Sequence, residues 1–105
     1  MDWHYWYTMW TTGTFTVSLT VPLDWQRSYL VTGGLTQTDG PDYAHVYIST
    51  VCSYDGGDQV LCGIRDDPDD SGLNLIEALD AASSVTVKLR TTGGRHRAEG
   101  FVYVD

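Results

Sequence analysis

The residues that could support catalysis in this sequence are mainly its three histidines. His4, His45 and His96 fall on separate predicted strands, and no local spacing links them. A catalytic triad assembles in space, but no serine here has a nucleophile-elbow context and neither cysteine matches a known catalytic signature. The double glycines stand between strands rather than in a phosphate-binding loop. We therefore expect no enzymatic activity and no cofactor.

An aspartate-rich segment is a weak candidate for a calcium site. Asp66, Asp67, Asp69 and Asp70 follow one another closely, and Ca²⁺ takes several oxygen ligands. However, the spacing differs from the EF-hand pattern, and Pro68 interrupts the run of donors. A solvated turn that leads into a helix, where acidic residues favour the N-terminal end of the dipole, explains the segment better.

The two cysteines fall on the two strands of a predicted hairpin. Apolar residues occupy even positions in both 43–54 and 59–65, so matching these faces needs a three-residue turn at 56–58. This register places Cys52 opposite Cys62, at a separation that a disulfide can span. The pair could form a disulfide, or remain two buried free thiols as in a reducing compartment. Two cysteines alone are too few ligands for a metal site.

The N-terminal segment carries aromatic residues on both faces of a predicted strand at 3–11. Trp3 and Tyr5 share one parity, whereas Trp6 and Trp10 share the other. A surface strand needs only one apolar face, so this strand is either covered on both sides or meets another molecule. Tryptophan and tyrosine are enriched at interface hot spots. A central strand, a protein interface and a sugar-stacking surface all remain open.

Four of the six basic residues gather near the C-terminus, where 84–91 and 97–104 predict a hairpin around two glycines. In the expected pairing Lys88 lies opposite Glu99, and Arg90 opposite Arg97. The same pairing turns Val85, Val87 and Leu89 to the core, opposite Val102, Gly100 and Ala98.

Two aromatic residues, Phe101 and Tyr103, then share the outer face of that hairpin with Arg90 and Arg97. The result is a cationic, aromatic strip on an otherwise acidic protein. Such a strip is either a docking surface or is covered by another part of the same chain.

These residues need a β framework to position them, and residues 14–21 provide its clearest signal. Four apolar residues alternate there with four threonines or serines, which is the pattern of a strand with one buried face. Turn residues recur at regular intervals, as in sandwiches and barrels. We expect strands near 3–11, 14–21, 28–35, 43–54, 59–65, 84–91 and 97–104.

One segment departs from this pattern. Leu75, Ile76, Leu79 and Ala82 recur at helical spacing, and they predict a short helix near 74–82. The expected fold is therefore all-β: an antiparallel β-sandwich or jelly-roll-like barrel of about seven strands with one short helix. A chain of 105 residues is expected to form a single β domain over 1–105.

The charge narrows the choice of partner. The net charge is −8, from 14 acidic and 6 basic residues, and such a chain repels nucleic acid at long range. No stretch approaches the length of a membrane span, and the N-terminus lacks the basic and apolar regions of a secretion signal. We expect no direct nucleic acid partner and no membrane insertion, with export, if any, by a route such as cell lysis.

The function that we expect is structural. A small, Thr-rich β domain without catalytic motifs fits a subunit or accessory protein of a larger assembly, such as a capsid-decorating, spike or tail component of a virus or phage particle assembled in the host cytoplasm. Its opposite charges suit contacts between subunits of the same or another kind. The expected partner-binding residues are Trp3, Tyr5, Trp6, Trp10, Arg90, Arg97, Phe101 and Tyr103.

Two other functions remain open. A carbohydrate-binding module would use Trp3, Trp6, Trp10 or Trp25 as stacking platforms for a glycan. A small acidic inhibitor would instead array its carboxylates along one continuous face, and here they gather in turns.

Overall fold

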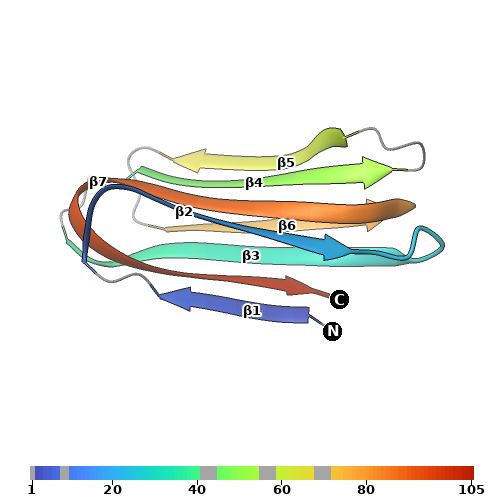
Figure 1. Ribbon diagram of the computed structural model, residues 1–105, viewed down its shortest axis with the longest axis horizontal. Coiled ribbons are helices and arrows are strands. Elements are labelled where there is room, and N and C mark those ends of the chain that lie inside the picture. Colours follow the sequence, from blue (N-terminus) through green and yellow to red (C-terminus); the bar gives the residue numbers. More distant parts are fainter. Residues whose placement is uncertain (1, 8–9, 41–44, 55–58, 68–71) are drawn as a thin grey trace.

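Seven antiparallel strands and no helix make up the described part of the chain. The computed structural model describes residues 2–7, 10–40, 45–54, 59–67 and 72–105, and only the backbone of residues 2, 7 and 65–67. The strands are β1 (Asp2–Tyr7), β2 (Thr11–Pro22), β3 (Ser28–Asp39), β4 (His45–Tyr54), β5 (Gln59–Asp67), β6 (Gly72–Asp80) and β7 (Ala82–Val104) (Figure 1).

Strand β7 is shared by two sheets that fold over each other. Its C-terminal half lies in sheet A, whose strand order is β1-β7-β3-β6. Its N-terminal half lies in sheet B, whose order is β2-β7-β4-β5. The curled sheet is an elongated antiparallel sandwich of 44 × 23 × 17 Å, so the predicted jelly-roll-like β fold is confirmed (Figure 1).

The core lies between the two sheets and is made of aliphatic residues from alternate positions. On β2 the alternation of 14–21 appears as predicted: odd residues face inward and even residues are exposed. Because β2 is an edge strand, its inward residues Val17 and Leu19 are only partly buried against the core. The fully buried side chains come mainly from the inner strands, among them Val31, Leu35, Ile48, Val87, Leu89 and Val102.

The predicted C-terminal hairpin is wrong, because 82–104 is one continuous strand that bends. Pairing of β2 and β4 with residues up to His96, and of β1 and β3 from Arg97 onward, carries β7 from one sheet to the other. Gly93 and Gly94 lie at the bend, where small residues permit sharp curvature. The predicted core residues are buried, but Arg90 does not lie opposite Arg97, nor Lys88 opposite Glu99.

The predicted helix near 74–82 is also wrong, because these residues form β6. Nine residue pairs join β6 to β3, from Ser28↔Asp80 to Thr36↔Gly72. Leu75 and Leu79 point into the core, whereas Ile76 is 68% exposed. The spacing of the apolar residues is compatible with both a helix and a strand. The segment forms a strand because it pairs with β3, and tertiary pairing often outweighs local preference.

The hairpin of β4 and β5 forms, but its register differs from the prediction. Cys52 lies opposite Val60, and a bulge between Thr50 and Val51 leaves Cys62 out of the ladder. The two cysteines are nevertheless joined by a disulfide, with their Cα atoms 5.9 Å apart. The bulge moves Cys62 next to Cys52 by irregularity of the strand, which sequence parity does not reveal.

Candidate functional site

The outer surface of sheet A carries aromatic and aliphatic side chains on all four strands, exposed on β1, β3 and β6 and half-buried on β7. Cross-strand neighbours form one row, from Trp3 through Tyr103 and Thr32 to Ile76. Four strands at a spacing of about 4.8 Å make this row roughly 14 Å wide. We call this surface the aromatic face and define it by Trp3, Tyr5, Leu30, Ile76, Phe101 and Tyr103.

The rings on this face are in contact with one another. Trp3 stacks on Phe101 with ring centroids 5.3 Å apart and an angle of 18° between the planes, and its centroid lies 5.6 Å from that of Tyr103. Trp3 is 59% exposed, so much of the indole faces solvent. The ring of Phe101 lies against Gly34 of β3, where an added Cβ would come within 2.9 Å of the ring carbon Cδ1.

A polar rim borders one end of the aromatic face. The Tyr5 hydroxyl donates a hydrogen bond of 2.5 Å to Oε2 of Glu99. Thr36 lies beside Glu99 on the neighbouring strand, and Asn74 lies on β6 in the row next to it. The surface therefore combines an apolar centre with a polar margin, as protein interfaces and sugar-binding platforms both do.

Strand β1 is an edge strand, which contradicts the reading of the N-terminal segment as a central strand. In the described part of the chain β1 pairs with β7 alone. Trp6 points inward and packs against the core beside His4, with the two ring centroids 6.2 Å apart. Trp6 therefore lies on the opposite face from Trp3 and Tyr5, as its parity predicted, although it was included with them among the expected partner-binding residues.

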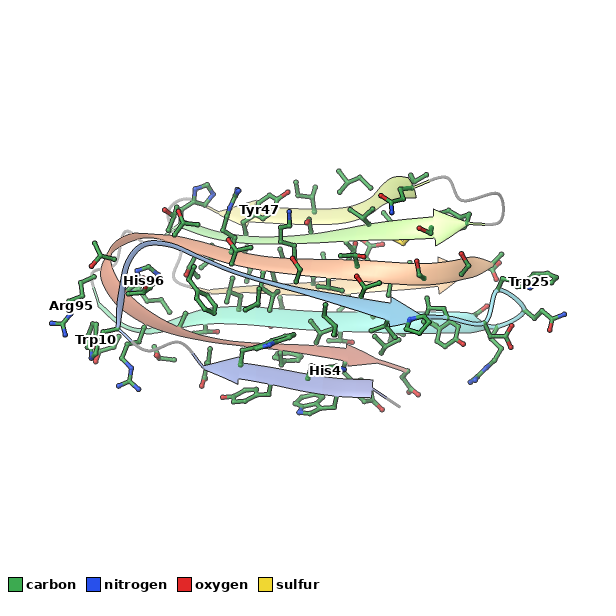
Figure 2. All side chains as sticks on the ribbon, viewed as in Figure 1. His4, Trp10, Trp25, Tyr47, Arg95 and His96 are labelled. Atoms are coloured by element: carbon green, nitrogen blue, oxygen red, sulfur yellow. A yellow bond between two sulfur atoms is a disulfide. The ribbon has the colours of Figure 1, made fainter. Side chains whose placement is uncertain are left out.

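The predicted cationic strip is divided between two places. Arg90 lies on the outer surface of sheet B, where its Cζ is 4.4 Å from the ring centroid of Tyr47. Arg97 lies at the bend of β7 with Arg95, and the Cζ atoms of these two residues are 6.0 and 4.5 Å from the ring centroid of Trp10. Figure 2 shows Trp10 and Arg95 together at this end of the molecule, with Trp25 at the other end.

Sequence reasoning left Arg95 and Tyr47 out of the candidate set. The one sequence signal that could have added Arg95 to this set is that it has the same parity as Arg97, two residues later. The contact of Arg95 with Trp10 joins residues 85 positions apart, and it exists because Thr11 pairs with His96 across the bend.

His96 is fully buried beside the bend of β7 (Figure 2). Its Nδ1 donates to the carbonyl oxygen of Gly94 at 2.7 Å, and its Nε2 lies 2.8 Å from the hydroxyl of Thr91. A carbonyl only accepts, so Nδ1 carries a proton and Nε2 can accept from Thr91. The three histidines do not meet: His96 supports the backbone, whereas His4 and His45 lie on β1 and β4.

The outer surface of sheet B is chemically different from the aromatic face. Threonines on β2 and β7 meet in pairs, with 3.0 Å between the hydroxyl oxygens of Thr14 and Thr92 and 2.9 Å between those of Thr20 and Thr86. Lys88 is exposed among them, opposite Ser18. The two outer surfaces of the sandwich therefore present apolar rings on one side and hydroxyl groups with cations on the other.

A cleft of about 400 Å³ lies along β6 and the neighbouring β5, lined by Ile64, Asn74, Leu75, Ile76 and Glu77. Glu77 is the one ionisable group in this lining. Among the described residues no group of three or more histidines, cysteines or carboxylates is arranged to hold a metal ion. The calcium candidate at Asp66, Asp67, Asp69 and Asp70 lies outside the described side chains. No helix suited to crossing a membrane occurs in the ranges described here.

No protein-family model and no curated protein matches this sequence. Several solved structures share its fold. A mitogen from Yersinia pseudotuberculosis superposes with a TM-score of 0.62 at 10% identity, over 96% of this chain and 84% of its own. A carbohydrate-binding module, TmCBM61, in complex with β-1,4-galactotriose gives 0.56 at 13% identity, over 91% of this chain and 66% of its own.

A third similar structure is VP2 of infectious bursal disease virus, from a subviral particle. Its TM-score is 0.54 at 12% identity; the match covers 98% of this chain but only 30% of VP2. At such identities the likeness establishes the jelly-roll type of sandwich and leaves function to the surfaces described above.

Proposed function

We propose that this chain is a non-enzymatic subunit or accessory protein of a virus or phage particle, and that it docks on another protein subunit through the aromatic face. The observation that carries the proposal is the exposure of that face on β1, β3 and β6 of sheet A. Trp3 and Ile76, at opposite edges of the sheet, are 59% and 68% exposed. Large exposed apolar patches on small domains are typical of interaction sites.

The composition of the face supports a protein partner. Tryptophan and tyrosine dominate interface hot spots because they provide a large contact area at a low cost in side-chain entropy. Here their rings are supported by each other and by Gly34, so little ordering remains on binding. Leu30 and Ile76 extend the apolar centre to the far side of the sheet, and they offer nothing to a sugar hydroxyl.

The fold supports the same proposal indirectly. A sandwich of this type occurs in VP2 of infectious bursal disease virus within a subviral particle. Assembly in the host cytoplasm and residence in the virion are part of the proposal.

Glycan binding is the second candidate, and the ring of Trp3 favours it. The indole stacks on Phe101, remains largely exposed, and lies near the Tyr5–Glu99 hydrogen bond. An open aromatic ring beside a polar pair could hold a sugar by stacking and hydrogen bonding. TmCBM61, which has a similar fold, was solved with β-1,4-galactotriose.

Sedimentation with particles tests the proposal. Particles from a culture that produces this chain are purified on a density gradient, and the chain is sought in the particle fraction by mass spectrometry. We expect the wild-type chain in that fraction and a Trp3→Ser/Tyr103→Ser variant in the soluble fraction. A matched control, Thr16→Ser on the outer surface of sheet B, should sediment like the wild type. Absence of the wild-type chain from purified particles would contradict the proposal, and a response of Trp3 resonances to galactotriose alone would favour the second candidate.

A further inference from the structure

We propose that the end of the molecule at the β7 bend binds a tetrahedral oxyanion, a phosphate or sulfate group, between the guanidinium groups of Arg95 and Arg97. This site lies on the bend rather than on the aromatic face, and it goes beyond the assembly role proposed above.

The two guanidinium groups lie near the same ring. The Cζ atoms of Arg95 and Arg97 lie 4.5 and 6.0 Å from the ring centroid of Trp10. Stacking on an indole occupies the flat face of a guanidinium group, whereas its five N–H donors lie in the plane and stay available. Both guanidinium groups therefore lie within 6.0 Å of the same indole ring, with N–H donors that the ring does not consume.

Arg95 and Arg97 have no ion-pair partner among the described residues. Asp39 is the cross-strand neighbour of Arg97, and Glu99 receives the hydrogen bond from Tyr5. Two like charges held together are unfavourable unless a counterion joins them, and a bound dianion removes that repulsion.

The backbone that presents the two arginines is fixed from inside. His96, which stands between them in sequence, is fully buried and hydrogen-bonded to Thr91 and Gly94. Thr11, next to Trp10, pairs with His96 across the strands. The exposed side chains of Arg95 and Arg97 therefore point outward from a rigid bend, and little order must be gained on binding.

The geometry favours a tetrahedral dianion over a carboxylate. One guanidinium group satisfies both oxygens of a carboxylate through a bidentate contact. Two groups approaching from different positions match a phosphate or sulfate, which offers at least three oxygens and up to two charges. A long nucleic acid is disfavoured, because the protein as a whole carries a net charge of −8.

Two other arginines provide matched controls. Arg27 stacks on Tyr29, with its Cζ 5.3 Å from the ring centroid, and Arg90 stacks on Tyr47 at 4.4 Å. Each of these rings holds a single arginine in the described structure. A response that required only a stacked arginine would appear at these places as well.

Titration followed by nuclear magnetic resonance tests the proposal. Sodium sulfate and inorganic phosphate are added to the ¹⁵N-labelled protein at constant ionic strength, with sodium chloride as the reference, and the indole N–H signal of Trp10 is assigned with Trp10→Phe. We expect saturable shifts of this signal with both dianions. Arg95→Gln and Arg97→Gln should each weaken binding by about tenfold or more, since a hydrogen bond to a charged group has that value.

The controls give opposite expectations. Arg27→Gln and Arg90→Gln should leave the affinity unchanged, and Asp39→Asn should increase it by removing a negative charge next to Arg97.

A sulfated oligosaccharide that shifts the same signal at lower concentration than free sulfate would show that the group is carried on a polymer. Equal affinity would assign the site to free anions. Linear shifts without saturation, or equal loss in Arg90→Gln, would overturn the proposal. The titration and its arginine controls do not depend on Trp3 or the aromatic face. Failure of the anion-binding proposal would therefore leave the assembly proposal intact.

Discussion

Trp3 and Phe101 stack across the edge of sheet A, with ring centroids 5.3 Å apart and planes inclined by 18°. This contact joins the first strand to the last, and it places two aromatic rings on an outer surface rather than in the core. Rings that support each other on the outside of a sandwich form a rigid, apolar contact surface. The stability of that surface and its use in binding can therefore be tested separately.

Gly34→Ala should disturb the aromatic face without filling the core. The added Cβ would come within 2.9 Å of ring carbon Cδ1 of Phe101, so the ring must move away from β3. Overpacking of this kind costs about 1 to 3 kcal/mol. We expect a lower free energy of unfolding in urea and altered near-UV circular dichroism.

The matched control for that substitution is Gly72→Ala. Gly72 lies on the same sheet, opposite Thr36, and a Cβ there would meet Oγ1 of Thr36 at 3.4 Å, an ordinary contact. Equal effects of the two substitutions would show that Phe101 does not rest on Gly34.

His96→Ala should destabilise the fold strongly. The substitution removes a fully buried ring and leaves the Thr91 hydroxyl and the Gly94 carbonyl without their partners. A cavity and an unpaired buried group each cost about 1 to 3 kcal/mol. We expect a loss of about 2 to 4 kcal/mol in the free energy of unfolding, measured in urea.

The reference for this loss is Thr20→Ala, which removes an exposed hydroxyl bonded to Thr86 and should change the stability by less than about 0.5 kcal/mol. A stable His96→Ala variant would mean that the bend of β7 does not depend on the buried imidazole.

Reduction of the disulfide should weaken the protein moderately. Cys52 and Cys62 are ten residues apart, so the bond closes a short loop in the unfolded chain. The chain-entropy relation gives about 2 to 3 kcal/mol for a loop of this length. We expect dithiothreitol to lower the urea midpoint of the wild type and to leave a Cys52→Ala/Cys62→Ala variant unchanged. A wild-type urea midpoint that does not change when dithiothreitol is added would contradict the presence of the disulfide.

The sequence predicted the β class and several faces because parity along a strand is a local property. Residues 14–21 alternate in the structure as they do in the sequence, and Phe101 and Tyr103 lie on the outer surface as expected. The predicted pairing of 84–91 with 97–104 was wrong, and the bend in its place was not predictable, because two glycines permit either a reversal or a bend. Only the presence of β1 to β4 beside β7 decides between them.

The parts of the candidate sites that escaped prediction depend on distant contacts. The helical spacing of Leu75, Ile76 and Leu79 fits a strand equally well, and the ladder to β3 decides the outcome. The joining of Trp10 to Arg95 requires the bend of β7 and the pairing of Thr11 with His96. No period or spacing within one segment contains that information.

Phe101→Ser separates the proposed assembly role of the aromatic face from its contribution to stability. Phe101 is half-buried on the outer surface, so its loss should leave a folded monomer, and it should weaken assembly by removing the support of Trp3. We expect unchanged far-UV circular dichroism. An unfolded variant would show that Phe101 belongs to the core.

The most direct measurement is the mass of the protein in solution, by light scattering over a series of concentrations. We expect the wild-type chain, or an equimolar mixture with its isolated particle partner, to form an oligomer well above 11.7 kDa. Trp3→Ser/Tyr103→Ser should remain a folded monomer of that mass, whereas Thr16→Ser should assemble. A wild-type chain that stays monomeric alone and with the particle partner, or a double variant that assembles equally well, would contradict the docking role of the aromatic face.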